Sequence, residues 1–278
     1  MVTFIGETMG RVYAPGEHYE SGEFPSALAI GDSWFWYPNN NILGTLTRHK
    51  LVSADHSRVQ NVGYNGALLQ DYVGAGRHAR SVEHYLSPNF SRGWSEFYIS
   101  GAGNDVVAYG LALKPNCVGI TDPRKCIHEG RMNDLLRSLS TSLGSLIHNI
   151  RWAYRKNPDA RHPIFLNGYD YPVPDGRGFA GGKGWLAPAM NQAGVERDVE
   201  FRKQVARAVI DQIADEVFKA FHSPQNMVIY LDSRGTLPTA PLEYEKYWAN
   251  EMHPTNLGFK AIIEEVWLPT LTKYGIAK

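Results

Sequence analysis

Five short segments, four of them mainly apolar, are each followed by glycine, asparagine or aspartate. Apolar runs of this length between turn-forming residues are typical of the inner strands of a parallel sheet, which are buried on both faces. The segments are Ala27–Ile30, Val59–Val62, Phe97–Ser100, Pro163–Leu166 and Met227–Leu231. We therefore expect five strands.

Between these segments the apolar residues recur every three or four positions, which is the period of an amphipathic helix. The clearest example is Met132–Tyr154, in which Leu135, Leu139, Leu143 and Leu146 fall on one face. We predict further helices at Asn41–Lys50, from Ala67, at His78–Tyr85, at Val195–Phe221, and from Asn256 to about Thr272 with Thr255 as its cap. Strands that alternate with helices predict an α/β fold, in which helices cover both faces of a five-stranded parallel sheet.

No segment is typical of a linker between two cores, so we predict a single domain over residues 1–278. Residues 1–25 are polar and rich in glycine and proline, and we expect them to form an N-terminal arm. Residues 107–130 and 171–194 show little periodicity and are predicted to be loop insertions. The first insertion contains Cys117 and Cys126, whose close spacing in a turn-rich loop suits either a disulfide or two free thiols.

The charge balance argues against some classes of partner. Lys and Arg together number 28, as do Asp and Glu, so there is no electrostatic reason to expect nucleic acid or an anionic membrane. No stretch approaches the roughly 20 apolar residues of a membrane-spanning helix. The first residues lack the basic start and apolar core of a signal peptide. We therefore take the cytoplasm as the default compartment, while a Cys117–Cys126 disulfide would suit export.

Residues able to do chemistry follow four of the predicted strands. Ser33 follows the first strand, Gly66 lies in the loop after the second, and Asn104 follows the third. His253 lies in the loop after the fifth strand, just before the last helix. Such loops open on one edge of a parallel sheet, so we expect the four residues to meet in one site.

These residue types suit acyl transfer. A serine hydroxyl becomes an effective nucleophile when a neighbouring imidazole takes its proton, which makes Ser33 the candidate nucleophile and His253 the candidate base. The oxyanion that then forms needs donors, for which the backbone N–H groups of Ser33 and Gly66 and the amide of Asn104 are candidates. Each residue taken singly has a structural explanation as a turn or a cap, but four in this arrangement favour one shared site.

The same residues resemble the sequence blocks of the SGNH or GDSL-type serine hydrolases, named after Ser, Gly, Asn and His. The blocks here are Gly31-Asp32-Ser33, Asn61 through Gly66, Gly103-Asn104-Asp105 and His253-Pro254, and they extend over residues 28–260. The resemblance implies a three-layer α/β/α, flavodoxin-like fold. It also implies ester hydrolysis through an acyl-enzyme, without a metal or organic cofactor.

The sequence departs from this family at the position that orients the histidine. The family usually has Asp three residues before the histidine, and this chain has Asn250. An amide can accept the imidazole N–H but cannot offset the charge of an imidazolium. Glu251, Asp232 or a backbone carbonyl of residues 248–250 are alternatives; we favour a Ser-His dyad supported by Asn250 or a nearby carbonyl.

We expect a serine ester hydrolase that acts on a lipid ester, a short-chain ester or an O-acetylated sugar. Trp34, Trp36 and Trp185 are predicted to line the substrate pocket, and Trp34 stands where the family often has leucine. The glycine-rich residues 176–184 lack a phosphate-binding pattern and are a candidate lid. The alternative function is a non-catalytic acyl- or glycan-binding module.

Overall fold

The sheet has six strands, all parallel, in the computed structural model, which describes residues 10–20, 22–37, 40–48, 52–157 and 161–277. The strands are β1 (Arg11–Tyr13), β2 (Ala27–Gly31), β3 (Arg58–Gly63), β4 (Glu96–Ser100), β5 (Ile164–Asn167) and β6 (Val228–Leu231). Their order is β1-β3-β2-β4-β5-β6. The predicted α/β class is confirmed, and all five predicted strands are present as β2 to β6.

The sixth strand, β1, corrects the prediction that residues 1–25 form only a polar arm, because Arg11–Tyr13 belongs to the sheet. β1 pairs in parallel with β3, with Arg11 opposite Arg58. Its inner residue, Tyr13, is fully buried and donates from its hydroxyl to the Glu23 carboxylate at 3.0 Å. An edge strand of three residues with one buried side chain is too short to produce an apolar run, which explains why the sequence pattern missed it.

The order of β2 to β6 is that of a flavodoxin-like sheet, in which the first strand of the set lies between the second and the third. Here β2 pairs with both β3 and β4. Ligands in such sheets bind beyond the carboxyl ends of the strands where the winding reverses. Ser33 follows β2 at this reversal, and Asn104 follows β4.

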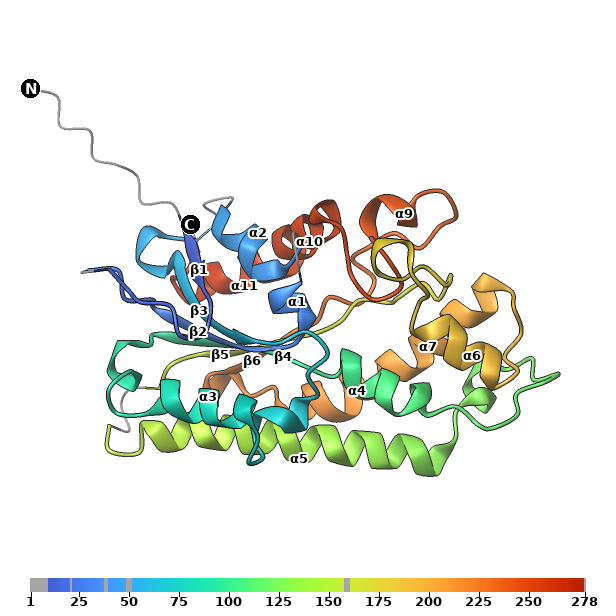
Figure 1. Ribbon diagram of the computed structural model, residues 1–278, viewed down its shortest axis with the longest axis horizontal. Coiled ribbons are helices and arrows are strands. Elements are labelled where there is room, and N and C mark those ends of the chain that lie inside the picture. The colour runs from blue at the N-terminus through green and yellow to red at the C-terminus, as the bar shows by residue number, and fades with distance from the viewer. Residues whose placement is uncertain (1–9, 21, 38–39, 49–51, 158–160, 278) are drawn as a thin grey trace, which may run out of the picture.

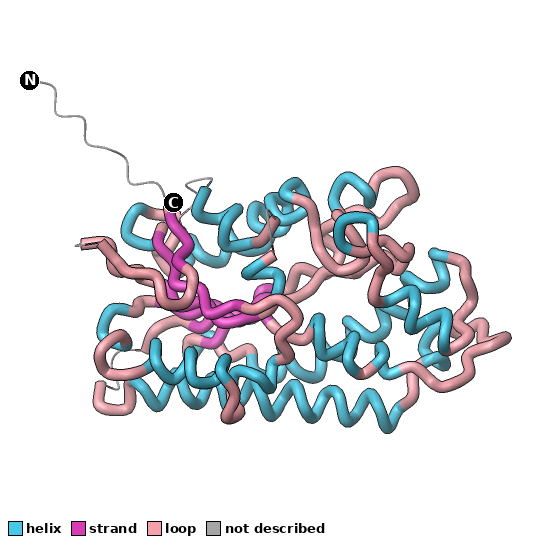
Figure 2. Tube along the Cα trace, viewed as in Figure 1, coloured by secondary structure: helices cyan, strands magenta, loops and turns pink. Residues whose placement is uncertain are grey.

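Helices cover both faces of the sheet, which gives three layers (Figures 1 and 2). One face carries α1 (Ser33–Trp36), α2 (Ile42–Arg48), α10 (Asn256–Ile262) and α11 (Leu268–Lys273), and the other carries α3 (Arg77–Leu86) and the long α5 (Glu129–Ala153). The remaining helices are α4 (Gly103–Ala108), α6 (Leu186–Gln192), α7 (Val199–Ile213), α8 (Lys219–Phe221) and α9 (Tyr244–Tyr247). The predicted long helices are observed, and Thr255 caps α10 by accepting from the Gly258 N–H at 3.2 Å.

The two predicted insertions have more structure than expected. Residues 171–194 contain α6, which the sequence analysis took for loop; Leu186, Ala187 and Met190 of this helix are buried. The insertion at 107–130 is closed by an antiparallel bridge between Leu113 and Ile127. It contains short 3₁₀ turns, and its two cysteines are buried free thiols rather than a disulfide.

Buried apolar side chains from all layers form one hydrophobic cluster. Within the described ranges, no helix combines the length and apolar character that a bilayer crossing requires. The same ranges contain no group of three or more His, Cys, Asp or Glu side chains that could hold a metal ion.

Candidate active site

Ser33 is held at the point where β2 turns into α1. Asp32 caps α1 by accepting from the Trp34 N–H at 3.1 Å. The same carboxylate accepts from the Ser100 hydroxyl at 3.0 Å and from the Tyr169 hydroxyl. Burial raises the pKa of Asp32. Asp32 therefore braces the turn and fixes the direction in which Ser33 points.

Ser33 and His253 form a hydrogen bond although 220 residues separate them. The Ser33 Oγ lies 2.7 Å from the His253 Nε2. Both residues are nearly enclosed, with exposed fractions of 6% and 5%. This is the contact expected between a serine nucleophile and its base.

Asn250 is hydrogen-bonded to the other imidazole nitrogen of His253, Nδ1. Its Oδ1 lies 2.9 Å from the His253 Nδ1 and also accepts from the backbone N–H groups of Met252 and His253, each at 3.0 Å. A backbone N–H can only donate, so these two bonds require the amide oxygen to stand at this position. The oxygen in turn selects the tautomer with a proton on Nδ1, which leaves Nε2 free to accept the Ser33 proton.

The alternative orienting groups are engaged elsewhere. The buried Glu251 accepts from the backbone N–H groups of Gly176, Leu186 and Ala187 at 2.7–2.9 Å. Asp232 is paired with Arg234 at 2.7 Å. Glu251 and Asp232 therefore do not contact the imidazole, and among the predicted candidates Asn250 is the one bonded to it.

The environment of His253 favours the neutral imidazole. Burial lowers its pKa from 6.5 to about 3. The Tyr37 ring is stacked on the imidazole with centroids 3.8 Å apart and planes 9° apart. Trp185 meets the same ring at 5.7 Å in an edge-to-face arrangement. His253 is therefore in the form of a base at neutral pH.

Tyr37, one of the aromatic residues after Ser33, is a site residue whose contact with His253 the sequence did not predict. Besides the stack, its hydroxyl accepts from the Asn250 Nδ2 at 3.0 Å. Phe179, from the glycine-rich segment, contacts the Tyr37 ring at 5.5 Å. Four aromatic residues follow Ser33 in the sequence, and nothing in their spacing distinguishes the one that reaches His253.

Two of the candidate oxyanion donors, Gly66 in the loop after β3 and Asn104 in the first turn of α4, lie on segments that are bonded to each other. The Asn104 Nδ2 donates to the Ala67 carbonyl at 3.0 Å, next to Gly66. Gly66 has a φ of +78°, a left-handed conformation that favours glycine. Asp105 braces the same junction by accepting from the Leu69 N–H at 3.2 Å, and burial raises its pKa to about 6. One Asn104 amide hydrogen remains beyond that bond, since the group carries two.

The three predicted pocket tryptophans differ in position. Trp185 contacts His253, as described above. Trp34 is only 2% exposed, packs on Tyr169 and Phe259, and donates to the Met252 carbonyl at 2.9 Å. Trp36 is 37% exposed and lies at the surface.

A small cavity of about 30 Å³ lies near the candidate site residues. Its lining includes Trp34, Gly103 and Met252, which are sequence neighbours of Ser33, Asn104 and His253. Tyr169, Leu186 and Trp248 also form part of its apolar wall.

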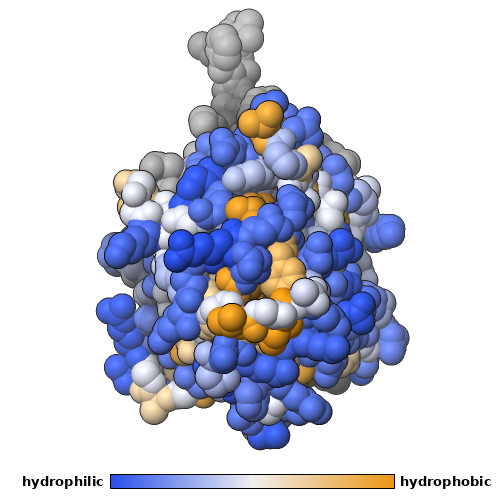
Figure 3. Space-filling view, turned by 90° about the vertical axis from the view of Figure 1, so that its right-hand side faces the viewer, coloured by the Kyte–Doolittle hydropathy of each residue, from blue (hydrophilic) through white to orange (hydrophobic). Residues whose placement is uncertain are grey.

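Apolar side chains gather in the centre of the outer surface at the end of the molecule that carries α6 and α9 (Figures 1 and 3).

The sequence matches no protein-family model and no curated protein. Among solved structures, the chain is similar to an extracellular lipase from Streptomyces rimosus, with 16% identity and a TM-score of 0.46 over 90% of this chain and 99% of that one. It is also similar to a carbohydrate esterase of family 3 from Talaromyces cellulolyticus, with 13% identity and a TM-score of 0.46 over 90% and 97%. A third match is a candidate GDSL-like lipase from Bacteroides ovatus, with 12% identity and a TM-score of 0.47 over 90% of this chain and 53% of that one.

These proteins are lipases and an esterase, the kind of neighbour that the resemblance to SGNH or GDSL-type hydrolases predicts. Because the identities are at most 16% and the TM-scores are below 0.5, we base the function of this chain on its own side chains.

Proposed function

We propose that the chain is a serine ester hydrolase that works through an acyl-enzyme. The observation that carries this proposal is the hydrogen-bonded row of Ser33, His253 and Asn250, with Oγ to Nε2 at 2.7 Å and Nδ1 to Oδ1 at 2.9 Å. The row supplies a nucleophile, a neutral base and an acceptor that fixes the tautomer of the base. The further requirement, a set of oxyanion donors, is assigned to the backbone N–H groups of Ser33 and Gly66 and to the amide of Asn104.

In the first half-reaction, the Ser33 Oγ attacks the ester carbonyl carbon while His253 Nε2 takes the hydroxyl proton. The negative charge moves to the carbonyl oxygen, where the three donors stabilise it. Collapse of this intermediate breaks the bond to the alcohol oxygen, which receives the proton from Nε2. In the second half-reaction His253 takes a proton from water, the hydroxide attacks the acyl-enzyme, and the acid leaves as Ser33 regains its proton.

Covalent labelling tests the nucleophile directly. We expect a fluorophosphonate to modify Ser33, located by peptide mass spectrometry, and Ser33→Ala to lower the hydrolysis of p-nitrophenyl acetate by about 10⁶-fold, the scale of a lost serine nucleophile. Ser138→Ala, a change on the long helix α5, is the matched control and should leave the rate unchanged. Hydrolysis that survives Ser33→Ala would contradict the assignment.

A non-catalytic acyl- or glycan-binding module is the second candidate, and the absence of a carboxylate at position 250 favours it. Such a module would bind ester or glycan without forming a covalent adduct. The same labelling experiment separates the two functions, because only the hydrolase would carry the phosphonate on Ser33.

The cavity beside the site supports a short acyl group as substrate. Trp34, Gly103 and Met252 of its lining are next in sequence to Ser33, Asn104 and His253, and its small volume of about 30 Å³ suits an acetyl group better than a long chain. With p-nitrophenyl esters, we expect kcat/KM for acetate to exceed that for octanoate by about 100-fold, since each excluded methylene costs binding. Leu186→Ala shortens a side chain of the cavity wall and so enlarges the cavity, which should bring the acetate-to-octanoate ratio of kcat/KM closer to one. A preference of the unmodified enzyme for octanoate would contradict the short-acyl assignment and leave the hydrolase assignment intact.

A further inference from the structure

The phenol of Tyr37 contacts the base and the residue that orients it. Its ring lies parallel to the imidazole of His253 at 3.8 Å, and its hydroxyl accepts from Asn250 Nδ2 at 3.0 Å. Both rings are nearly enclosed, with 8% of Tyr37 and 5% of His253 exposed. The stack is therefore shielded from water. Electrostatic interactions are stronger in such an enclosed environment than in water.

The proposed reaction places a positive charge on His253 each time that Nε2 takes a proton. No carboxylate of the described residues is bonded to the ring to offset this charge. Asp32 is bonded to Trp34, Ser100 and Tyr169, and Glu251 is bonded to the backbone of Gly176, Leu186 and Ala187. The amide of Asn250 offers a dipole but no net charge, and burial disfavours the imidazolium further.

The face of an aromatic ring carries partial negative charge and attracts a cation placed over it. Protonation of His253 would put such a cation over the Tyr37 ring at the distance already observed, without any movement of the two rings. We propose that the Tyr37 ring stabilises the imidazolium of His253 in the transition state, in the role that a carboxylate has in a Ser-His-Asp triad. This inference rests on the proposed hydrolase function, and it assigns Tyr37 a role that acts through His253.

Fluorination of the ring tests this role with little change in shape, because fluorine withdraws electron density from the ring face. The reference is Tyr37→Phe, which keeps the ring and removes the hydroxyl bonded to Asn250. The test series replaces this phenylalanine with its mono-, di- and trifluorinated analogues. The matched control places the same analogues at Phe35, a buried core residue that packs on Trp267.

We expect Tyr37→Phe to be active but slower than the unmodified enzyme, because the ring face remains while the Asn250 amide loses its acceptor. Along the fluorinated series kcat should fall stepwise, to about a tenth of the phenylalanine variant with three fluorines, with KM changed less than twofold. The analogues at Phe35 should leave kcat constant. Tyr37→Leu, which removes the ring, should lower kcat about 10- to 30-fold.

A kcat that stays constant along the fluorinated series overturns the proposal, even if Tyr37→Leu is slow, because the ring would then act by packing alone. Thermal unfolding of each variant identifies any loss of rate that comes from misfolding. Failure of the proposed function has a different signature: the unmodified enzyme would neither hydrolyse esters nor accept the fluorophosphonate at Ser33, which overturns both proposals together.

Discussion

The connection from β6 to α10 begins and ends at two sites that are stabilised by different forces. At its beginning, Arg234 lies among three aspartates, whereas at its end His253 is surrounded by an amide, aromatic rings and backbone groups. The two sites belong to one segment, residues 232–253, so the difference between them reflects their surroundings rather than their place in the sequence.

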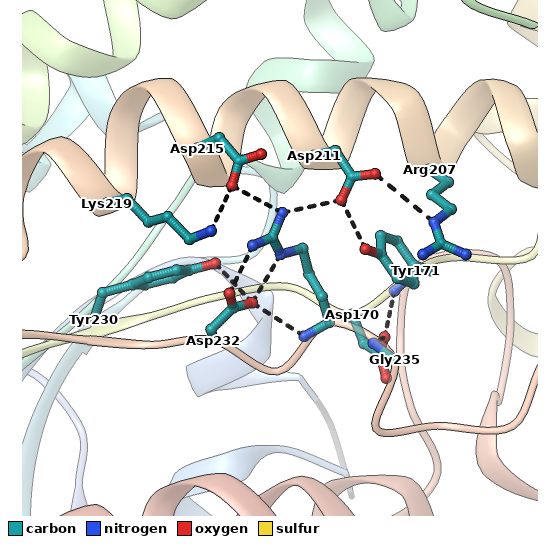
Figure 4. A network of polar contacts seen from close by, with 10 residues as sticks. Asp170, Tyr171, Arg207, Asp211, Asp215, Lys219, Tyr230, Asp232 and Gly235 are labelled. Atoms are coloured by element: carbon teal, nitrogen blue, oxygen red, sulfur yellow. Dashed lines mark hydrogen bonds and ion pairs between the residues drawn. The ribbon is translucent and has the colours of Figure 1, made fainter.

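Charge pairing stabilises the first site, which borders the solvent. Arg234 bonds to Asp232 at 2.7 Å and to Asp211 at 2.9 Å, and lies 3.2 Å from Asp215. The two latter aspartates lie on or next to α7, so the cluster ties the end of β6 to that helix (Figure 4). The Arg234 side chain is 12% exposed, while its aspartate partners are 35–52% exposed.

Dipoles and ring contacts stabilise the second site, which is enclosed. A charge buried without a partner costs far more than a buried hydrogen-bonded amide. Asn250 is such a hydrogen-bonded amide, since its oxygen has three donors and its nitrogen has Tyr37 as acceptor. The comparison teaches that the ion pairs of Arg234 border the solvent, whereas the proposed base at the enclosed site has a neutral resting state.

Among changes that spare the nucleophile, removal of a proposed oxyanion donor next to the enclosed site should have the largest effect. Asn104→Ala deletes an oxyanion donor and should lower kcat by about 10²- to 10³-fold with p-nitrophenyl acetate, while KM changes little. Asn133→Ala, an exposed change on α5, is the control. A kcat within threefold of the unmodified enzyme would remove Asn104 from the oxyanion site.

Changes at Asn250 sharpen the comparison, because they convert the neutral site into a charged one. Asn250→Ala removes the acceptor of Nδ1 and should lower kcat about 10- to 100-fold, the range typical of losing a group that orients a functional histidine. Asn250→Asp keeps an acceptor and adds a negative charge, which favours the imidazolium and raises the pKa of His253.

The pH profile of kcat/KM measures this change. Protonation removes the base as the pH falls, and a His253 pKa of about 3 keeps the base form present in mild acid. We therefore expect the unmodified enzyme to hold its plateau down to about pH 5, and Asn250→Asp to lose activity at a higher pH than the unmodified enzyme. Identical acid limbs in the two proteins would show that position 250 does not govern the charge of His253.

The smallest expected effect lies at the charged site. Arg234→Met removes a cation that three aspartates share, although Asp215 keeps Lys219 and Asp211 keeps Arg207. It should lower the free energy of unfolding by about 1–2 kcal/mol, since the partners are half exposed. The corresponding fall in Tm is about 2–4 °C per kcal/mol. Hydrolysis should stay within twofold, and Arg137→Met, which breaks an exposed pair with Asp134, should change neither quantity. A tenfold loss of activity in Arg234→Met would mean that the two sites are coupled.

The parts of the fold that the sequence predicted are those with strong local signals. Buried strands and the long amphipathic α5 have the periodicity that such elements require, and Thr255 is a residue type that caps helices. β1 and α6 were missed because each is short and lies in a segment rich in glycine and proline. Their burial comes from tertiary contacts, which local patterns do not record.

In the candidate site, too, the residues predicted from sequence are those placed by the strand pattern, and those missed depend on tertiary contacts. Ser33 and His253 are predictable because a parallel sheet brings the ends of its strands to one edge. Asn250 was among the predicted orienting groups, but the sequence could not say which group faces the imidazole, nor what Tyr37 and Glu251 contact. Neighbouring residues 250 and 251 illustrate this: the amide contacts the imidazole, and the carboxylate contacts a distant backbone.

Glu251 has a consequence for redesigning substrate choice. Its carboxylate bonds to the chain at Gly176, Leu186 and Ala187, on both sides of residues 177–185, and a side chain at Gly184 would collide with it at 2.1 Å. Segments of other length and composition grafted between these bonded ends would therefore enter and leave at fixed points. Both points are bonded to Glu251, the residue next to Asn250 in the sequence. The rim of the site can then diversify by exchange of a single loop, while the neighbouring Asn250 and His253 keep their places.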